Sequence, residues 1–243
     1  MVELSLGKWV FNLTTINYPL SIFTKKCTFA LNLICFMNQK SLFIVIEGLD
    51  GSGKTSVSEQ LAKDLDPTNR GFIVRTNEPN DDMVGGQFIR DILTKKRTDY
   101  TPEVLPLAFA ANRLDHCDRL IKPWLEGEGR IVISDRYYLS SLVYQSSPTF
   151  SFENVMFCNQ FALKPDIIFF INVDNKICYE RMKHRNQPPE LFETNLSAYR
   201  DKFFKAIEFL RETRNENIVE IDGNGSISEV ANAVREVVLR LMS

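Results

Sequence analysis

The sequence predicts an α/β fold in which helices flank a doubly wound, five-stranded parallel sheet. Short apolar runs, bounded by turn signals, alternate along the chain with stretches of helical spacing. The runs are nearly continuous in hydrophobicity, which is typical of parallel strands that are buried on both faces. The first run leads into a glycine-rich loop, residues 48–55, that matches G-x-x-x-x-G-K-[ST] at every fixed position.

The expected strands are short and rich in β-branched and aromatic residues, and they cover 42–47, 71–76, 130–134, 166–173 and 217–221. The expected helices lie between and after them, at 54–66, 85–96, 102–126, 139–146, 154–162, 176–184, 196–214 and 228–242. The first helix follows the glycine-rich loop directly. Pro188 and Pro189 interrupt helical structure, so residues 183–193 are the expected flexible segment.

Composition and charge limit the classes of function. The 243 residues, of which 44% are hydrophobic, are enough for one α/β domain with a substantial core. A net charge of −2 argues against a broad electrostatic surface for nucleic acid. The five cysteines form no C-x-x-C pair, so we expect reduced thiols in a reducing, cytoplasmic compartment and neither a disulfide framework nor a zinc site.

The first 36 residues differ from the rest of the chain. They contain one acidic residue and no arginine, and the uncharged run at 27–39 is too short to span a bilayer. These residues resemble a secretory signal only weakly. A transit peptide should be rich in arginine, which this segment lacks. We therefore expect residues 1–36 to be a dispensable extension outside the mature or true protein, with an organelle-targeting segment as the alternative. Residues 37–243 are expected to form a single domain with no membrane partner.

The glycine-rich loop indicates a site for the phosphates of a nucleoside triphosphate. Backbone N–H groups at Gly48, Gly51 and Gly53 can turn inward around phosphate oxygens, where a side chain would collide. Lys54 supplies a positive charge for the terminal phosphates, and the Thr55 hydroxyl suits Mg²⁺. The helix dipole favours the same anions. Further ATP contacts are expected from Asp50, Ser52 and Ser56.

A second signal for a nucleotide site is the apolar strand at 130–134, which is followed by Asp135. A carboxylate at the end of a strand beside the phosphate loop can hold Mg²⁺ or its bound waters. The expected metal ligands are therefore Thr55 and Asp135, and the expected cofactor is Mg²⁺ with ATP as phosphate donor.

Four blocks, in order, resemble the thymidylate kinase family. Residues 135–145 read DRYYLSSLVYQ, similar to the family segment D-R-[YH]-x-x-S-x-x-x-Y. Residues 107–113, LAFAANR, match its F-x-x-x-R helix, and residues 76–79, TNEP, resemble its T-R-E-P turn. Residues 190–193, ELFE, resemble the E-R-[IFY]-E block after its lid. The resemblance implies a P-loop fold like that of nucleoside monophosphate kinases, with a short lid.

The resemblance also implies a dTMP site built on two helices. Phe109 and Arg113 are one helical turn apart, so Phe109 can stack on a pyrimidine while Arg113 donates to its O4 carbonyl. A cytosine amino group at that place would face the guanidinium donor with a second donor. In a dry site this mismatch would cost about 1–3 kcal/mol of binding free energy. Ser141 and Gln145, also one turn apart, offer hydrogen bonds to the base edge. Tyr144 resembles the tyrosine that excludes a ribose 2′-hydroxyl.

Sugar and phosphate contacts follow from the same resemblance. Asp50 is expected to approach the sugar 3′-hydroxyl, and Glu78 of the TNEP turn is assigned to the dTMP site. Arg90 and Arg136 are the expected clamps on the monophosphate, because guanidinium forks fit phosphate oxygens.

The implied reaction is ATP + dTMP → ADP + dTDP with Mg²⁺. The nucleophile is already a phosphate oxygen, so catalysis depends on alignment and on charge around the transferred group. Some family members carry an extra arginine inside the phosphate loop, where this chain has Gly51. A bacterial-type arginine from the lid is therefore expected, with Arg185 catalytic and Arg181 near adenine. The full expected catalytic set is Lys54, Asp135, Arg136 and Arg185.

Two departures from the family pattern leave alternatives open. Asn77 and Leu191 stand where the family has arginine, and Arg75 is the residue that could compensate. The alternatives are a related kinase acting on dUMP, dCMP or UMP, and a non-catalytic nucleotide-binding module. The resemblance further implies a homodimer, for which the long helix at 102–126 is a suitable element, and no nucleic-acid partner is expected.

Overall fold

The computed structural model describes residues 40–67, 69–184, 191–192 and 195–242, together with two short strands near the N-terminus. These strands, β1 (Ser5–Leu6) and β2 (Trp9–Val10), pair antiparallel. The chain divides into two compact units, Met1–Gln39 and Lys40–Ser243. The predicted boundary after residue 36 lies outside the described residues.

A five-stranded parallel sheet forms the centre of the second unit, as the sequence predicts. Its spatial order is β4–β5–β3–β6–β7. The strands are β3 (Leu42–Glu47), β4 (Ile73–Asn77), β5 (Ile131–Asp135), β6 (Ile167–Asn172) and β7 (Ile218–Asp222). The central strands are buried along nearly their whole length, which explains their continuous hydrophobicity. Because β3 and β5 are direct neighbours, the segments that follow them meet at one edge of the sheet.

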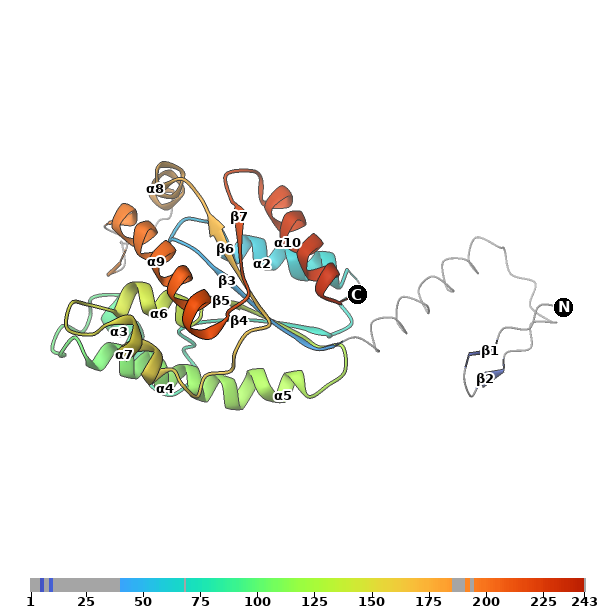
Figure 1. The fold of residues 1–243 in the computed structure, drawn as a ribbon, viewed down its shortest axis with the longest axis horizontal. Coiled ribbons are helices and arrows are strands. Elements are labelled where there is room, and N and C mark those ends of the chain that lie inside the picture. The colour runs from blue at the N-terminus through green and yellow to red at the C-terminus, as the bar shows by residue number, and fades with distance from the viewer. Residues whose placement is uncertain are drawn as a thin grey trace. The chain divides into compact units, whose positions relative to one another are not determined.

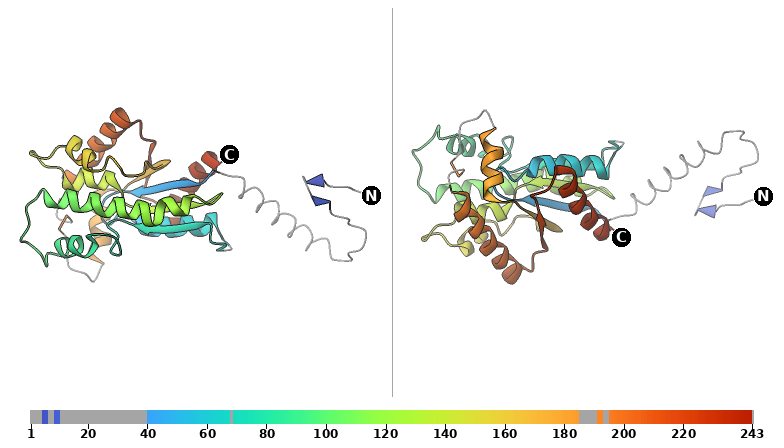
Figure 2. Two further views of the ribbon diagram at one scale, coloured as in Figure 1. Left: turned by 90° about the horizontal axis from the view of Figure 1, so that it is seen from below. Right: turned by 90° about the horizontal axis from the view of Figure 1, so that it is seen from above.

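Helices cover both faces of the sheet (Figures 1 and 2). Helices α2 (Lys54–Leu65) and α10 (Ile227–Met242) pack together on one face. The opposite face carries α4 (Val104–His116), with α6 (Tyr138–Gln145) and α7 (Phe152–Cys158) packed against it. The remaining helices are α3 (Gly86–Leu93), α8 (Asn175–Lys183) and α9 (Leu196–Arg214). No helix within the described ranges is long and apolar enough to cross a membrane.

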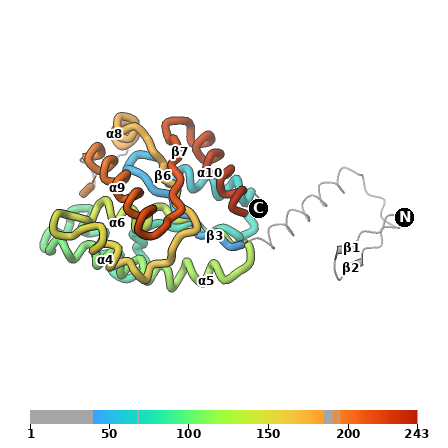
Figure 3. The backbone as a smooth tube through the Cα atoms, viewed as in Figure 1, coloured from blue at the N-terminus to red at the C-terminus, as the bar shows by residue number. Residues whose placement is uncertain are grey.

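The predicted helix at 102–126 is a continuous helical path of three parts, which can be followed in Figure 3. After α4 the chain widens into a π-helical turn, η1 (Cys117–Ile121), and continues as α5 (Lys122–Leu125). The proline at 123 lacks an N–H group, and its ring crowds the carbonyl of the preceding turn, so a wider turn there relieves the contact.

The helix predicted at 154–162 starts earlier and is shorter than expected. It begins at Phe152 because Ser151 caps it, in a capping box with Asn154. It ends at Cys158, and the chain then turns through Asn159. A serine followed three residues later by an asparagine is a recognisable signal for a helix start, but the prediction from helical spacing did not use it.

Asp66, directly after α2, stabilises the connection to β4 in a pH-dependent way. Burial alone would raise the pKa of Asp66, but backbone N–H groups of Arg70 and Phe72 and the Arg70 guanidinium together lower it. A lowered carboxyl pKa adds stability above the ordinary value, and this stability is lost as the pH falls through the folded-state value. We expect Asp66→Asn to lower the midpoint of thermal unfolding by about 2–4 °C at pH 7, and by less at pH 3. Calorimetry at both pH values measures this, with the exposed Asp64→Asn as control. An equal difference at both pH values would rule out the charge as the cause.

Candidate active site

The phosphate loop joins β3 to α2 in a conformation that only glycine adopts readily. Gly51 has φ +81°, and a Cβ built there would lie 2.4 Å from the backbone oxygen of Cys178 in α8. Gly53, the residue before α2, is also left-handed, with φ +88°. The glycines therefore allow both the turn and the close approach of α8, and no side chain fits at position 51.

Lys54 is buried inside this loop. Its Nζ donates to the backbone oxygens of Gly48, at 3.0 Å, and Leu49, at 2.6 Å. Burial, together with the neighbouring positive charge of Arg136, lowers the pKa of Lys54 to about 8, while the carboxylate of Asp50 opposes the shift. The loop thus holds a buried cation against two of its own backbone carbonyl groups.

Asp135 ends β5 beside the phosphate loop, in register with Ile46 of β3. Its Oδ1 is buried and has no hydrogen-bond partner among the described residues. Asp135 and Thr55 line the same cavity. An unpaired carboxylate oxygen and a hydroxyl are the hard oxygen donors that Mg²⁺ prefers, so the residues present fit this ion.

Arg136 links the phosphate loop to α6. Its backbone is left-handed, with φ +68°, which turns the side chain back toward the loop. The guanidinium donates to Asp50 and, at 3.0 Å, to the hydroxyl of Ser140, and it lies 5.3 Å over the ring of Tyr144. Burial would lower the pKa of Arg136, but the carboxylates of Asp50 and Glu47 raise it, so the guanidinium stays charged.

Glu47 is a functional neighbour that sequence reasoning missed. It ends β3, is fully buried, and accepts the backbone N–H groups of Tyr137, at 2.7 Å, and Ser140, at 3.0 Å. It also accepts the Ser140 hydroxyl at 2.6 Å. Burial raises the pKa of Glu47, while Arg136 and these hydrogen bonds oppose the shift. Glu47 thus fixes the start of α6 beside the loop, and an acidic residue ending a fully apolar strand was the available signal.

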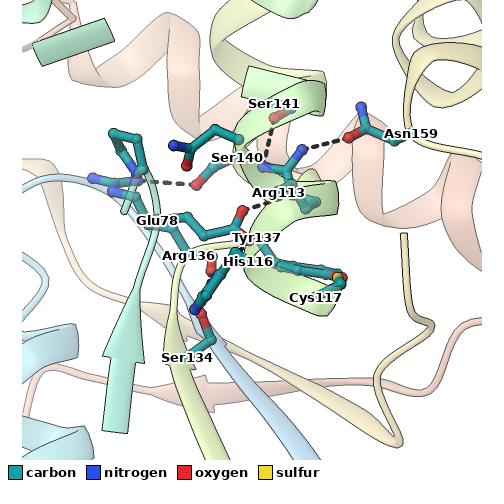
Figure 4. A network of polar contacts seen from close by, with 12 residues as sticks. Glu78, Arg113, His116, Cys117, Ser134, Arg136, Tyr137, Ser140, Ser141 and Asn159 are labelled. Carbon is teal, nitrogen blue, oxygen red and sulfur yellow. Dashed lines mark hydrogen bonds and ion pairs between the residues drawn. The ribbon is translucent and has the colours of Figure 1, made fainter. Parts of the chain in front are cut away.

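Arg113 is the centre of a buried polar network at the other end of the site (Figure 4). Only 1% of it is exposed. It donates to Glu78 at 2.6 Å, to the Ser141 hydroxyl at 3.0 Å and to the side-chain oxygen of Asn159. The network joins α4, which carries Arg113, to the turn after β4, to α6 and to the end of α7, so three segments distant in sequence hold one guanidinium.

Glu78 has both carboxylate oxygens bonded within the protein. Its second oxygen lies 3.1 Å from Nδ1 of His116, which is also fully buried. No local sequence pattern marks His116, because its partners come from β4 and the turn that follows it.

One cavity of about 580 Å³ collects most of the predicted residues. The predicted residues that line it are Asp50, Gly53, Lys54, Thr55, Ser56, Glu78, Arg90, Phe109, Arg113, Asp135, Arg136, Ser141, Tyr144 and Gln145. Lining residues absent from the predicted set are Arg75, Thr76, Asn77, Pro79, Leu93, Tyr137, Ser140 and Phe192. The cavity therefore unites the phosphate loop with the predicted pyrimidine-recognition residues.

Several predicted residues have other or additional contacts. Arg90 donates to Asp81 through Nε at 3.1 Å and Nη2 at 3.0 Å. Arg181 donates to the backbone oxygen of Ser52 at 3.3 Å, so it lies against the phosphate loop. Of the other loop residues, Gly48, Gly51 and Ser52 are not among those lining the cavity. Arg185 lies outside the described residues.

The two departures from the family pattern have local partners. Asn77 donates to the backbone oxygen of Pro79 at 3.0 Å. Leu191 packs against the apolar cluster around Ile92 and Phe109, and its N–H donates to the oxygen of Leu93 at 3.1 Å. An arginine at position 191 would place a charge against that apolar cluster.

A P-loop sheet, a buried phosphate-loop lysine, a strand-terminal aspartate and an adjoining acceptor pocket define a nucleotide-binding phosphotransferase. The thymidylate kinase family model matches residues 46–234. A probable thymidylate kinase of Thermococcus kodakarensis is 37% identical over 189 residues, covering 74% of this chain and 90% of the relative. This chain belongs to the thymidylate kinase family.

Further relatives agree with this assignment. The thymidylate kinase of Halalkalibacterium halodurans is 34% identical over 209 residues, covering 83% of this chain and 98% of the relative. The solved structure of thymidylate kinase from Candida albicans superposes with a TM-score of 0.64 at 22% identity, covering 83% of this chain and 92% of that one. This likeness supports the fold, with its five-stranded parallel sheet and flanking helices.

Proposed function

We propose that this protein transfers the γ-phosphoryl group of ATP to dTMP, giving ADP and dTDP. The observation that carries the proposal is a single cavity that holds both the phosphate loop and a buried arginine–serine pair suited to a pyrimidine edge. Arg136 bridges the two halves, because it bonds Asp50 of the loop and Ser140, the neighbour of Ser141.

Recognition of thymine follows from the donors and acceptors in the pocket. Three of the five N–H groups of Arg113 are bonded to protein, so one on each terminal nitrogen remains to meet a 4-carbonyl. The buried Oε1 of Gln145 has no partner among the described residues and can accept the N3–H of thymine. Cytosine reverses both groups, with an amino group at C4 and an acceptor at N3, so it is disfavoured by about 1–3 kcal/mol at each mismatch.

Catalysis in this proposal is electrostatic. The attacking oxygen of dTMP is anionic and needs no general base, so Lys54 and Arg136 align the phosphates and neutralise charge during transfer. Thr55 and Asp135 would hold Mg²⁺, which would neutralise phosphate charge at this site. Arg185 remains the proposed lid arginine, and the absence of room for a side chain at Gly51 supports a source outside the loop.

A substrate panel tests the proposal directly. ADP release is measured with Mg·ATP and dTMP, dUMP, dCMP, UMP or dGMP on the full chain. We expect the highest kcat/KM for dTMP, with dCMP lower by about tenfold or more. If another monophosphate were preferred, the assigned acceptor would be that nucleotide and not dTMP. If ATP bound but no acceptor were phosphorylated, the protein would be a nucleotide-binding module.

We expect Asp135→Asn to raise the Mg²⁺ concentration for half-maximal activity by about tenfold and to lower the maximal rate by about 10²-fold. The change removes the charge of a carboxylate whose Oδ1 is buried without a partner among the described residues. Mg²⁺ titrations at fixed ATP measure both quantities, with Asp118→Asn on the surface as the matched control. A wild-type Mg²⁺ dependence in Asp135→Asn would exclude this residue as a ligand.

A homodimer in the cytoplasm completes the proposal. On the packed helices α4 and α7, Leu107 is 55% exposed, Phe157 70% and Phe161, just beyond α7, 68%. Large exposed apolar side chains of this kind are typical of an interface. Sedimentation of the wild type and of the double variant Leu107→Glu/Phe161→Glu tests this prediction. A monomeric wild type would contradict it.

The proposed cytoplasmic location agrees with the cysteines. The free thiols of Cys117, Cys158 and Cys178 fit a reducing compartment.

A further inference from the structure

His116, which lies beside Glu78 in the buried network of Figure 4, has a hydrogen-bond partner at each ring nitrogen. Its Nδ1 lies 3.1 Å from Oε1 of Glu78, and its Nε2 lies 2.7 Å from the hydroxyl oxygen of Thr76. None of the histidine is exposed, and its side chain does not line the cavity. Any effect of His116 on the cavity is therefore exerted through its neighbours.

The chemistry of Glu78 fixes the direction of the hydrogen bond at Nδ1. A carboxylate only accepts, so Nδ1–H of His116 donates to Glu78. Nε2 pairs with the hydroxyl of Thr76, which can donate or accept, and the oxygen of that hydroxyl also accepts from Asn80 at 3.4 Å. A continuous chain of hydrogen bonds therefore connects Asn80, Thr76, His116 and Glu78.

Glu78 receives the guanidinium of Arg113 from the other side, through Nε at 2.6 Å. One carboxylate oxygen is thus held by His116 and the other by Arg113, which fixes the rotation of the carboxylate. Both Glu78 and Arg113 are almost fully buried, so an oxygen of Glu78 that lost its partner would take a new donor or admit water.

We propose that His116 is a positioning residue for pyrimidine recognition: by holding Glu78 it aims the remaining N–H groups of Arg113 at the base in the cavity. This inference rests on the proposed phosphorylation of dTMP. Arg113 touches the substrate and His116 does not, so the effect of His116 is on acceptor binding and selectivity, and the ATP side of the cavity is unaffected.

Two substitutions of His116 test the roles of its two ring nitrogens separately. The amide nitrogen of His116→Asn lies near the position of Nδ1 and can still donate to Glu78. His116→Gln instead extends toward Thr76, the position of Nε2, and leaves Oε1 of Glu78 without its donor. Thr76→Val is a third variant that removes the hydroxyl holding Nε2 while preserving the shape of the strand residue.

We expect His116→Gln to raise the KM for dTMP about tenfold with kcat nearly unchanged, and to reduce the preference for dTMP over dCMP several-fold. We expect His116→Asn to stay within about threefold of the wild type and Thr76→Val to be intermediate, with the KM for ATP constant in all three. Tyr138→Phe is the matched control, because it removes a buried 2.6 Å hydrogen bond to Glu216 outside the cavity. It should lower the unfolding temperature without changing the KM for dTMP.

Each contrary result is decisive. If the KM for dTMP of His116→Gln stays within twofold of the wild-type value, the inference is overturned. If His116→Gln does not fold, Thr76→Val supplies the same test. If Tyr138→Phe raised the KM for dTMP as much as His116→Gln does, the cause would be a general loss of stability. The same conclusion would follow if His116→Asn and His116→Gln raised this KM equally and kept the preference for dTMP over dCMP. A wild type inactive on dTMP defeats the proposed function itself, whereas an active wild type with unchanged variants defeats only the role of His116.

Discussion

Arg136→Ala is expected to lower kcat for dTMP phosphorylation by about 10³-fold while ATP still binds. The guanidinium is the structural bridge between Asp50 and Ser140, and it lies over the ring of Tyr144. Removing it deletes the charge that clamps the acceptor phosphate and leaves Asp50 to repel that phosphate. The lost attraction and the new repulsion act on the same group, which is why the expected effect is large.

Coupled ADP release and nucleotide-binding calorimetry measure the two halves of this prediction. Arg119→Ala, which removes a 58%-exposed arginine from the outer side of the same helical region as Arg113, should keep near-normal activity. If Arg136→Ala retained more than about a tenth of the wild-type kcat, its assignment as phosphate clamp would be wrong.

Lys54→Met is expected to lower kcat/KM for ATP by about 10³-fold. The side chain is of similar length but carries no charge, so the terminal phosphates lose their buried cation. The Nζ donors to Gly48 and Leu49 also disappear, and the loop carbonyls that accepted them are left buried.

Steady-state kinetics with varied ATP measure this effect, and thermal unfolding reports whether the loop change lowers stability. Lys63→Met is the matched control, because Lys63 lies in the last turn of the same helix, away from the phosphate loop. A Lys54→Met enzyme with a normal kcat/KM for ATP would mean that the loop binds no triphosphate in the proposed way.

Local patterns in the sequence were sufficient for the sheet and for the phosphate end of the site. Parallel strands buried on both faces have continuous apolar runs, and the glycine-rich loop must follow one such strand because its backbone conformation requires glycine at fixed places. The amino-acid pattern alone therefore assigned Gly51, Lys54 and Asp135 to one edge of the sheet, where the fold places them. The π-helical turn before Pro123 was not predictable from helical spacing, which does not distinguish it from a regular turn.

Only the tertiary structure decided which buried polar groups pair with one another. Glu47 meets Ser140, and His116 meets Glu78, across 93 and 38 residues of chain. Such pairs have no periodic signal, because each forms where neighbouring elements leave a buried donor facing a buried acceptor. The sequence by itself determined the fold, the phosphate loop and the family. The packing of three separate segments around Arg113 determined how that arginine is held, because a buried charge must be satisfied by whatever partners the fold brings to it.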